Sequence, residues 1–223
     1  MPPTTDHLSP NHGPRATDAV IDMLVLHYTG MVDADAALQR MTDSASEVSA
    51  HYMIDEDGKV FRLVDEERRA WHAGVAQWRG HDDINGRSIG IELVNPGHEF
   101  GYRAFPEPQM AALISLATAI VGHHSIPPRN VVGHSDVAPS RKEDPGELFD
   151  WKRLATAGLG LWPAEASGEP DDVPAMLASY GYDISDIDAA VTAFQRHFRT
   201  ERIDGVADET CARRLAGLLS LID

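Results

Sequence analysis

The chain has 223 residues, and its 19 lysines and arginines against 35 aspartates and glutamates give a formal net charge of −16 at pH 7. This balance excludes a general nucleic-acid-binding protein, because binding to phosphates requires clustered basic residues, and it argues against adhesion to an anionic membrane surface. The single cysteine, Cys211, excludes an intrachain disulfide framework and a cysteine-rich zinc site. The chain also carries 11 histidines, an unusually large number for this length.

Residues 1–18 are rich in proline, threonine, histidine and asparagine, and we expect them to form an irregular lead-in. They show neither the basic start nor the apolar stretch of a secretory signal peptide. No part of the chain approaches the roughly 18 consecutive apolar residues that suggest a membrane span. These observations predict a cytoplasmic protein, with a periplasmic or envelope location as the alternative.

Residues 19–162 carry the mixed pattern of an α/β domain. In chain order, apolar runs and helical spacings predict a strand at 20–28, a helix at 33–41, strands at 49–54, 59–64 and 88–94, a helix at 106–124, a short strand at 131–134 and a helix at 149–157. The two strands at 49–54 and 59–64 flank Asp57-Gly58, and such a pair supplies the positive φ angles of a tight hairpin turn. The sequence therefore predicts a mixed central β-sheet flanked by helices.

The composition changes near Pro163. Residues 163–170 are small, acidic and interrupted by glycine and proline, as linkers are. Residues 171–223 then show three helical patterns, at 173–180, 186–198 and 208–219. In the middle one, Ile187, Val191, Phe194 and Phe198 recur at helical spacing. We expect a small all-α domain of three helices.

Four histidines lie at or near the ends of apolar, strand-like segments, where side chains converge: His27, His51, His72 and His134. The other seven are expected to be solvated or packed without a chemical role. A catalytic zinc ion takes three protein ligands and leaves a fourth position for water. His27, His134 and Asp144 are candidates for such a set. The alternative is that they are a packed sheet residue, a loop residue and a surface acid.

Two charged residues are further candidates for chemistry. Glu92 interrupts the apolar run at 89–94, and a buried carboxylate has a raised pKa that suits a general base near neutral pH. The alternative is that strand alternation points Glu92 at solvent. Lys142 lies two residues before Asp144 and could stabilise a developing oxyanion, or could be an ordinary surface charge.

Six blocks together resemble one known family. In order along the chain, they are LHYT (26–29), SAHYMID (49–55), WHAG (71–74), NGRSIGIELVN (85–95), VGHSDVAPSRKEDPG (132–146) and FDW (149–151). They are similar to the zinc-dependent N-acetylmuramoyl-L-alanine amidases, whose fold is shared with phage T7-type lysozymes and animal peptidoglycan recognition proteins. The resemblance covers roughly residues 18–155.

The resemblance implies a role for each matching residue. It makes His27, His134 and Asp144 the ligands of one zinc ion per chain. It makes Glu92 the catalytic acid and base, and Lys142 a group that helps to polarise the scissile carbonyl. It also implies that four residues line the substrate groove: His51, Trp71, His72 and Asn85.

The implied activity is zinc-dependent hydrolysis of the amide between N-acetylmuramic acid, or its 1,6-anhydro form, and L-alanine. The substrate would be peptidoglycan or a muropeptide, and the expected setting is cell-wall recycling. One alternative is an envelope amidase acting on intact peptidoglycan. Another is a non-catalytic peptidoglycan receptor, which the full set of candidate ligands disfavours.

The C-terminal segment resembles the three-helix peptidoglycan-binding modules that are often joined to such enzymes. The matching stretches are FQRHF (194–198) and DGVADETC (204–211). This copy either binds glycan or only packs against the catalytic domain. The sequence does not indicate an oligomeric state.

Overall fold

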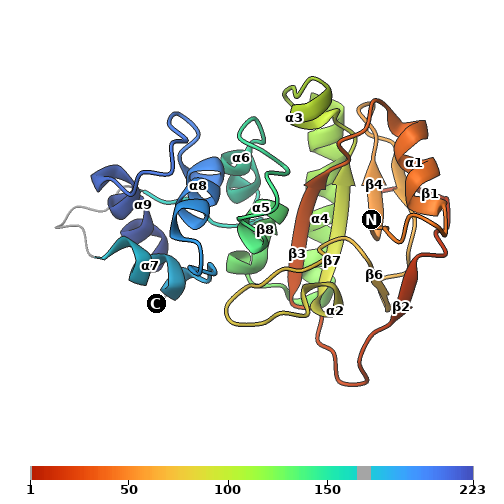
Figure 1. The fold of residues 1–223 in the computed structure, drawn as a ribbon. Helices are drawn as coiled ribbons and strands as arrows, with labels where there is room; N and C mark the ends of the chain where they lie inside the picture. Colours follow the sequence, from red (N-terminus) through yellow and green to blue (C-terminus); the bar gives the residue numbers. More distant parts are fainter. Residues whose placement is uncertain (1, 165–171, 223) are drawn as a thin grey trace.

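The computed structural model describes residues 2–164 and 172–222, and its centre is a six-stranded sheet with the order β1-β5-β4-β7-β3-β8 (Figure 1). The strands are β1 (Thr4–Asp6), β3 (Met23–Tyr28), β4 (Tyr52–Ile54), β5 (Val60–Arg62), β7 (Ser88–Leu93) and β8 (Val131–Gly133). A separate pair joins β2 (His12–Pro14) to β6 (Arg68–Ala70). The expected mixed α/β architecture is confirmed.

The middle of the sheet is parallel. Strand β7 pairs in parallel with both β4 and β3, and β3 pairs in parallel with β8. Strands β4 and β5 form the expected antiparallel hairpin, and Gly58 in its turn has a φ of 87°. Because parallel strands end at the same edge, the carboxyl ends of β3, β7 and β8 meet there, which is where ligands bind in open α/β sheets.

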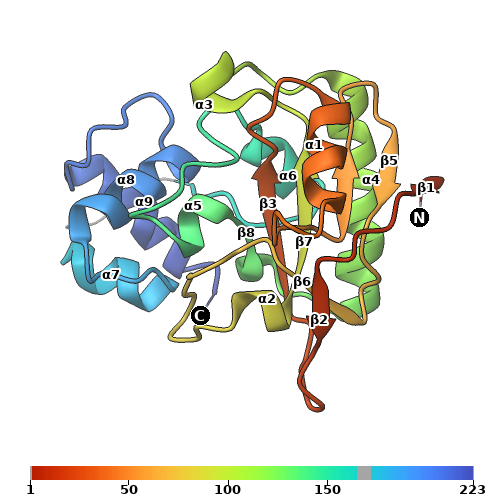
Figure 2. The same cartoon turned by 45° about the vertical axis from the view of Figure 1, so that its right-hand side comes forward.

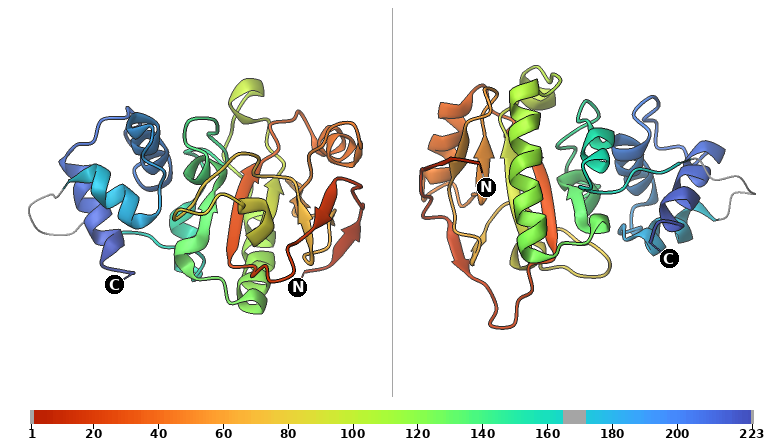
Figure 3. Two further views of the ribbon diagram at one scale, coloured as in Figure 1. Left: turned by 60° about the horizontal axis from the view of Figure 1, so that its bottom comes forward. Right: turned by 180° about the vertical axis from the view of Figure 1, so that it is seen from behind.

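Helices cover both faces of the sheet. In the first part of the chain they are α1 (Ala34–Thr42), α2 (Ile84–Arg87), α3 (Gly97–Phe100), α4 (Glu107–His124), the 3-10 turn Pro128–Asn130, α5 (His134–Val137) and α6 (Trp151–Thr156). Helix α4 runs along one face, as the right-hand view of Figure 3 shows. None of the helices in residues 2–164 and 172–222 has the length and apolar character needed to cross a membrane.

Alternation along the strands separates a packing face from a chemical face. Leu24 and Leu26 of β3, with Ile89 and Ile91 of β7, pack in one core cluster with the buried side of α4. The intervening side chains point the other way because strand side chains alternate. On β7, those opposite residues are Ser88, Gly90 and Glu92. Glu92 therefore interrupts the apolar run because its side chain lies on the face of the sheet opposite α4.

The C-terminal helices α7 (Val173–Tyr180), α8 (Ile187–Phe198) and α9 (Glu209–Leu219) lie beside α5 (Figure 2). They do not form an isolated core. Phe194 and Leu215 belong to the same cluster of buried residues as Met23, Trp78 and Val132 of the sheet-containing part. The predicted three helices are present, and they share a continuous apolar core with the rest of the molecule.

Two segments differ from the sequence expectation. The lead-in at residues 1–18 contains β1 and β2, which add to the edges of β5 and β6. These strands carry few apolar side chains and are held by backbone hydrogen bonds, so no hydrophobic period marks them. Between the strand expected at 131–134 and the helix expected at 149–157, the chain forms the short helix α5, which begins at His134. Most of the predicted linker, residues 165–170, lies outside the described residues.

The shared core predicts that both parts unfold together. Phe194 is fully buried in the shared cluster, and replacing a buried Phe by Ala costs about 3–5 kcal/mol. We expect a single transition in guanidinium, followed by tryptophan fluorescence and far-ultraviolet circular dichroism, and Phe194→Ala should lower its midpoint for both probes. Two separate transitions, with only one of them shifted, would contradict a continuous core.

Candidate metal centre

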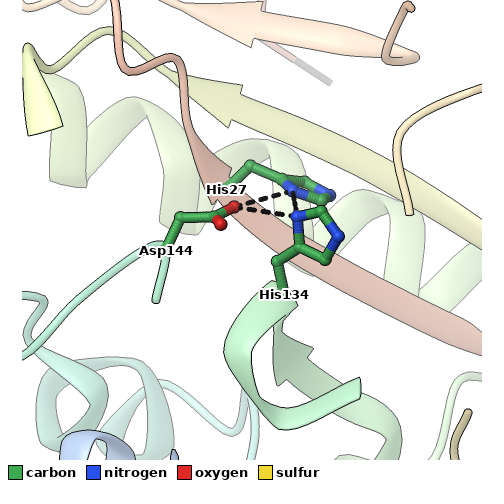
Figure 4. Close-up of side chains that lie close together, drawn as sticks. All are labelled: His27, His134 and Asp144. Carbon is green, nitrogen blue, oxygen red and sulfur yellow. Dashed lines mark hydrogen bonds and ion pairs between the residues drawn. The ribbon is translucent and has the colours of Figure 1, made fainter. Parts of the chain in front are cut away.

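Three segments bring a compact donor group to the carboxyl edge of the sheet. His27 is the fifth residue of the six-residue strand β3, and His134 begins α5 directly after β8. Asp144 approaches from the following loop, where its carbonyl oxygen accepts a hydrogen bond from the Ser135 amide at 2.9 Å. Figure 4 shows the three side chains pointing toward one another. The structure thus brings together the three residues predicted as ligands.

The donor atoms form a nearly equilateral triangle. His27 Nδ1 lies 3.0 Å from His134 Nδ1 and 3.0 Å from Asp144 Oδ2, and the last two atoms are 3.1 Å apart. A tetrahedral ion with bonds of about 2.0–2.1 Å places its ligand atoms about 3.3 Å apart. All three residues are buried, with exposed fractions of 1%, 3% and 7%. The group therefore fits a metal ion with two nitrogen ligands and one oxygen ligand.

The outer nitrogen of each histidine has its own partner. His134 Nε2 lies 3.0 Å from the Ala73 carbonyl oxygen, so it carries the proton and donates. This hydrogen bond leaves the lone pair of His134 Nδ1 free to bind a cation. Metal-bound histidines are commonly oriented by a carbonyl or carboxylate in this way.

His27 is oriented by a longer chain of hydrogen bonds. Its Nε2 lies 3.0 Å from His72 Nδ1, and His72 Nε2 lies 3.1 Å from the Ser88 hydroxyl. The Ser88 hydroxyl in turn donates to the Ile84 carbonyl oxygen at 2.6 Å. The hydroxyl donation fixes the direction of the chain, so His27 Nε2 donates and His27 Nδ1 presents its lone pair to the metal position. His72 lines the cavity and also accepts the hydrogen bond that orients His27.

Burial keeps the two linked imidazoles neutral. It lowers the pKa of His27 to about 4, with a further contribution from the neighbouring His134. It also lowers the pKa of His72 well below its ordinary value. A neutral imidazole is the form that binds metal, so the site is prepared for a cation at neutral pH.

Glu92 faces the same cavity. The register pairs it with His27 across β7 and β3. Its Oε2 atom is buried and has no hydrogen-bond partner among the described residues. Burial, then the negative charge of Asp144, raises the pKa of Glu92 well above its ordinary value, and Lys142 partly opposes this. A carboxyl group with a raised pKa that shares a cavity with a metal site is suited to act as a general base.

The cavity has a volume of about 380 Å³ and opens to the surface. Its walls include the metal-site residues, with Trp71 and His72 on one side, and the exposed Lys142 at its rim. Arg40 of α1 and Arg141 also line the cavity. The sequence pattern does not mark either residue, because neither interrupts an apolar run. Three carboxylates, those of Glu92, Glu143 and Asp144, line the same cavity, so its walls carry both signs of charge.

Two predicted groove residues lie elsewhere. His51 is fully buried and away from the cavity walls: its Nδ1 accepts from the Gly90 amide at 2.9 Å, and its Nε2 lies 3.0 Å from the Arg68 carbonyl oxygen. Asn85 is also buried, and its Oδ1 accepts hydrogen bonds from the amides of His72 and Ala73. Both residues hold the backbone that carries the site, so the expectation that they contact a ligand does not agree with their positions.

The sequence resembles a described protein family over most of its length. The model of the N-acetylmuramoyl-L-alanine amidase family matches residues 17–147. N-acetylmuramoyl-L-alanine amidase AmiD of Escherichia coli (strain K12) is 39% identical over 219 residues, covering 84% of this chain and 78% of that protein. The 1,6-anhydro-N-acetylmuramyl-L-alanine amidase AmpD of the same organism is 33% identical over 163 residues, covering 66% and 87%.

Solved structures show the same likeness. The complex of E. coli AmiD with the substrate anhydro-N-acetylmuramic acid-L-Ala-D-gamma-Glu-L-Lys has a TM-score of 0.81 and 36% identity, covering 93% of this chain and 92% of that one. AmpDh3 from Pseudomonas aeruginosa, in complex with anhydromuramic pentapeptide, has a TM-score of 0.82 and 34% identity, covering 96% and 98%. With this coverage, the likeness extends into the C-terminal helices.

Gly90 provides a direct test of the support behind His27. A Cβ atom at Gly90 would lie 2.5 Å from Cγ and 2.7 Å from Nδ1 of His72, so Gly90→Ala forces the ring to move and disturbs the hydrogen bond between His72 Nδ1 and His27. Disturbing such an outer partner typically weakens metal binding about 10- to 100-fold. We expect this loss when the dissociation constant is measured by chelator competition with zinc as the probe ion.

Gly122→Ala is the matched control, because an added methyl group there meets nothing within 4 Å. It lies within α4, where alanine is the better helix former. We expect its zinc affinity to equal that of the unmodified protein. Equal affinities in the Gly90 and Gly122 variants would show that His72 does not orient His27.

Proposed function

Because the chain belongs to the N-acetylmuramoyl-L-alanine amidase family, we propose that it hydrolyses the amide between a muramic acid lactyl group and L-alanine. The observation that carries the proposal is the buried group of His27, His134 and Asp144 facing the same cavity as Glu92. The complete ligand set favours an enzyme over a non-catalytic receptor. Two similar proteins are solved with anhydromuropeptides, which supports this substrate class here.

We assign one zinc ion per chain to the metal position. Two imidazoles and one carboxylate form a set that zinc accepts in catalytic sites, with a fourth position left open. When bound, zinc lowers the pKa of water and polarises a carbonyl oxygen. The short donor distances and the outward hydrogen bonds of both histidines support this assignment.

The remaining steps belong to the side chains around the cavity. Glu92 is placed to take a proton from the attacking water and to return it to the departing L-alanine nitrogen. Its raised pKa makes this carboxylate a stronger proton acceptor than that of an exposed glutamate. The Lys142 ammonium at the rim favours the negative charge that develops on the carbonyl oxygen. The exposed Arg40 guanidinium in the same cavity is placed to attract a carboxylate of a stem peptide.

Glu92→Gln tests the proposed reaction. The change keeps the side-chain shape but removes the proton acceptor, and a general base contributes about 10²- to 10⁴-fold to a rate. We expect kcat for an anhydromuropeptide to fall by at least the lower of these factors while one zinc per chain is retained. Products are quantified by mass spectrometry and zinc by elemental analysis.

Glu99→Gln, at an exposed position of α3, is the control and should retain full activity and zinc. If Glu92→Gln retains the activity of this control, Glu92 is not the base. If the unmodified protein with zinc releases no L-alanine-terminated peptide, the proposed activity itself is wrong.

For the setting, we propose cytoplasmic recycling of soluble 1,6-anhydro fragments. The fold is formed without disulfides, since the one cysteine, Cys211, is free and buried, and this suits a reducing compartment. Soluble anhydromuropeptides should therefore be cleaved faster, per amide bond, than intact peptidoglycan, and cell fractionation should place the protein in the cytoplasm. Faster cleavage of intact peptidoglycan and recovery in the envelope fraction would favour the alternative, an envelope amidase.

A further inference from the structure

Asp136 is a buried carboxylate two residues after the ligand His134, and its exposed fraction is 1%. Its Oδ2 accepts a hydrogen bond from the Gly133 amide at 2.7 Å, which closes the turn of α5 on itself. Its other two partners come from the C-terminal helical part. The Tyr182 hydroxyl donates to Oδ1 at 2.6 Å, and His197 Nδ1 donates to Oδ2 at 2.7 Å.

His197 is held in one orientation. Its ring is stacked between Trp151 and Phe198, with both ring centroids 3.7 Å away and interplanar angles of 19° and 8°. Trp151 belongs to the core cluster under the sheet, and Phe198 belongs to the cluster shared with the C-terminal helices. The imidazole therefore joins the two parts of the molecule and aims its Nδ1 at Asp136.

The position of Asp136 determines the positions of two metal ligands, His134 and Asp144. Helix α5 has only four residues, so fixing Asp136 and Gly133 also fixes His134 between them. The Ser135 amide then donates to the Asp144 carbonyl oxygen at 2.9 Å. Gly133 itself is tightly packed, because a Cβ there would lie 2.8 Å from Pro145 and 3.2 Å from Trp151. The turn has little space in which to shift.

We propose that the C-terminal helical part is a component of the metal centre, in which Tyr182 and His197 act on Asp136 as positioning residues for His134 and Asp144. The inference rests on the zinc site of the proposed function but adds a role for the helices. A buried carboxylate that loses one of its donors must reorient toward the remaining ones, because its desolvation is costly when hydrogen bonds are missing. Here that reorientation would turn α5 and separate the two ligands from His27.

His197→Leu in the full chain is the principal test. It removes the donor to Asp136 while keeping an apolar side chain between the stacked rings. Loss of a group bonded directly to a metal ligand typically weakens metal binding about 10- to 100-fold, and His197 acts one residue further out, so a loss of about 10-fold is expected. We expect that loss in the zinc dissociation constant, measured by chelator competition without substrate. For anhydromuropeptide cleavage at saturating zinc, kcat should fall while KM changes little, because Arg40 and Trp71 line the groove from other elements.

Two further variants separate the loss of the hydrogen bond from a disturbance of packing. His197→Asn places a side-chain amide nitrogen near the position of Nδ1, so it should restore much of the zinc affinity that His197→Leu loses. Tyr182→Phe removes a single hydroxyl group and disturbs packing least. It should weaken zinc binding in the same direction, by less than His197→Leu.

Gln195→Ala is the matched control on the same helix. Gln195 is fully buried and holds the 204–206 turn through hydrogen bonds with Asp204, Gly205 and Val206, all of them within the C-terminal part. Its replacement should lower the melting temperature but leave the zinc affinity unchanged.

Several outcomes overturn the proposal. Equal losses of zinc affinity in Gln195→Ala and His197→Leu would mean that only the stability of the helices matters. An unchanged affinity in His197→Leu, or no recovery in His197→Asn, would also reject it. Zinc binding is measured without substrate. An absence of amidase activity in the unmodified protein would therefore overturn the proposed function, while the zinc affinities would still test the role of His197.

Discussion

The metal centre depends on keeping three electron-pair donors, two neutral imidazole nitrogens and a carboxylate oxygen, 3.0–3.1 Å apart in a buried site. Such lone pairs repel one another unless a proton or a metal ion lies between them. Burial disfavours the protonated imidazole and lowers the pKa of His27 to about 4, so at neutral pH the cation that fits is a metal ion. Neighbouring residues make this arrangement possible by holding each ring and each turn in one position.

The sheet meets that requirement through alternation. The side of β3 and β7 that packs on α4 is aliphatic, which leaves the opposite side free for His27 and Glu92 at matched positions. Gly90 leaves room for the His72 ring, and Ser88 anchors it. The hydrogen-bond chain that orients His27 therefore ends on the same strand that supplies the proposed base.

Local patterns in the sequence predict the mixed α/β class, the hairpin and the three C-terminal helices, whereas the parallel pairing of the central strands is seen only in the structure. The patterns also single out His27, His134 and Glu92, because these residues stand at the ends of apolar runs or within them. Asp144 is a further candidate, although it lies in a loop ten residues after His134. Patterns do not reveal partners that come from distant segments. The edge strands in residues 1–18 are held by backbone pairing. Asp136 and His197 look like ordinary helix residues until the tertiary packing brings them together.

We propose that His27, His134 and Asp144 together hold a zinc ion. X-ray absorption spectroscopy of the zinc-loaded full chain tests it most directly. We expect a first shell of nitrogen and oxygen at about 2.0–2.1 Å, with imidazole scattering from two histidines and no sulfur. In His134→Ala the imidazole contribution should fall to one histidine and the affinity should collapse. A sulfur ligand at about 2.3 Å, or a spectrum unchanged in His134→Ala, would show that these three residues do not hold the zinc ion.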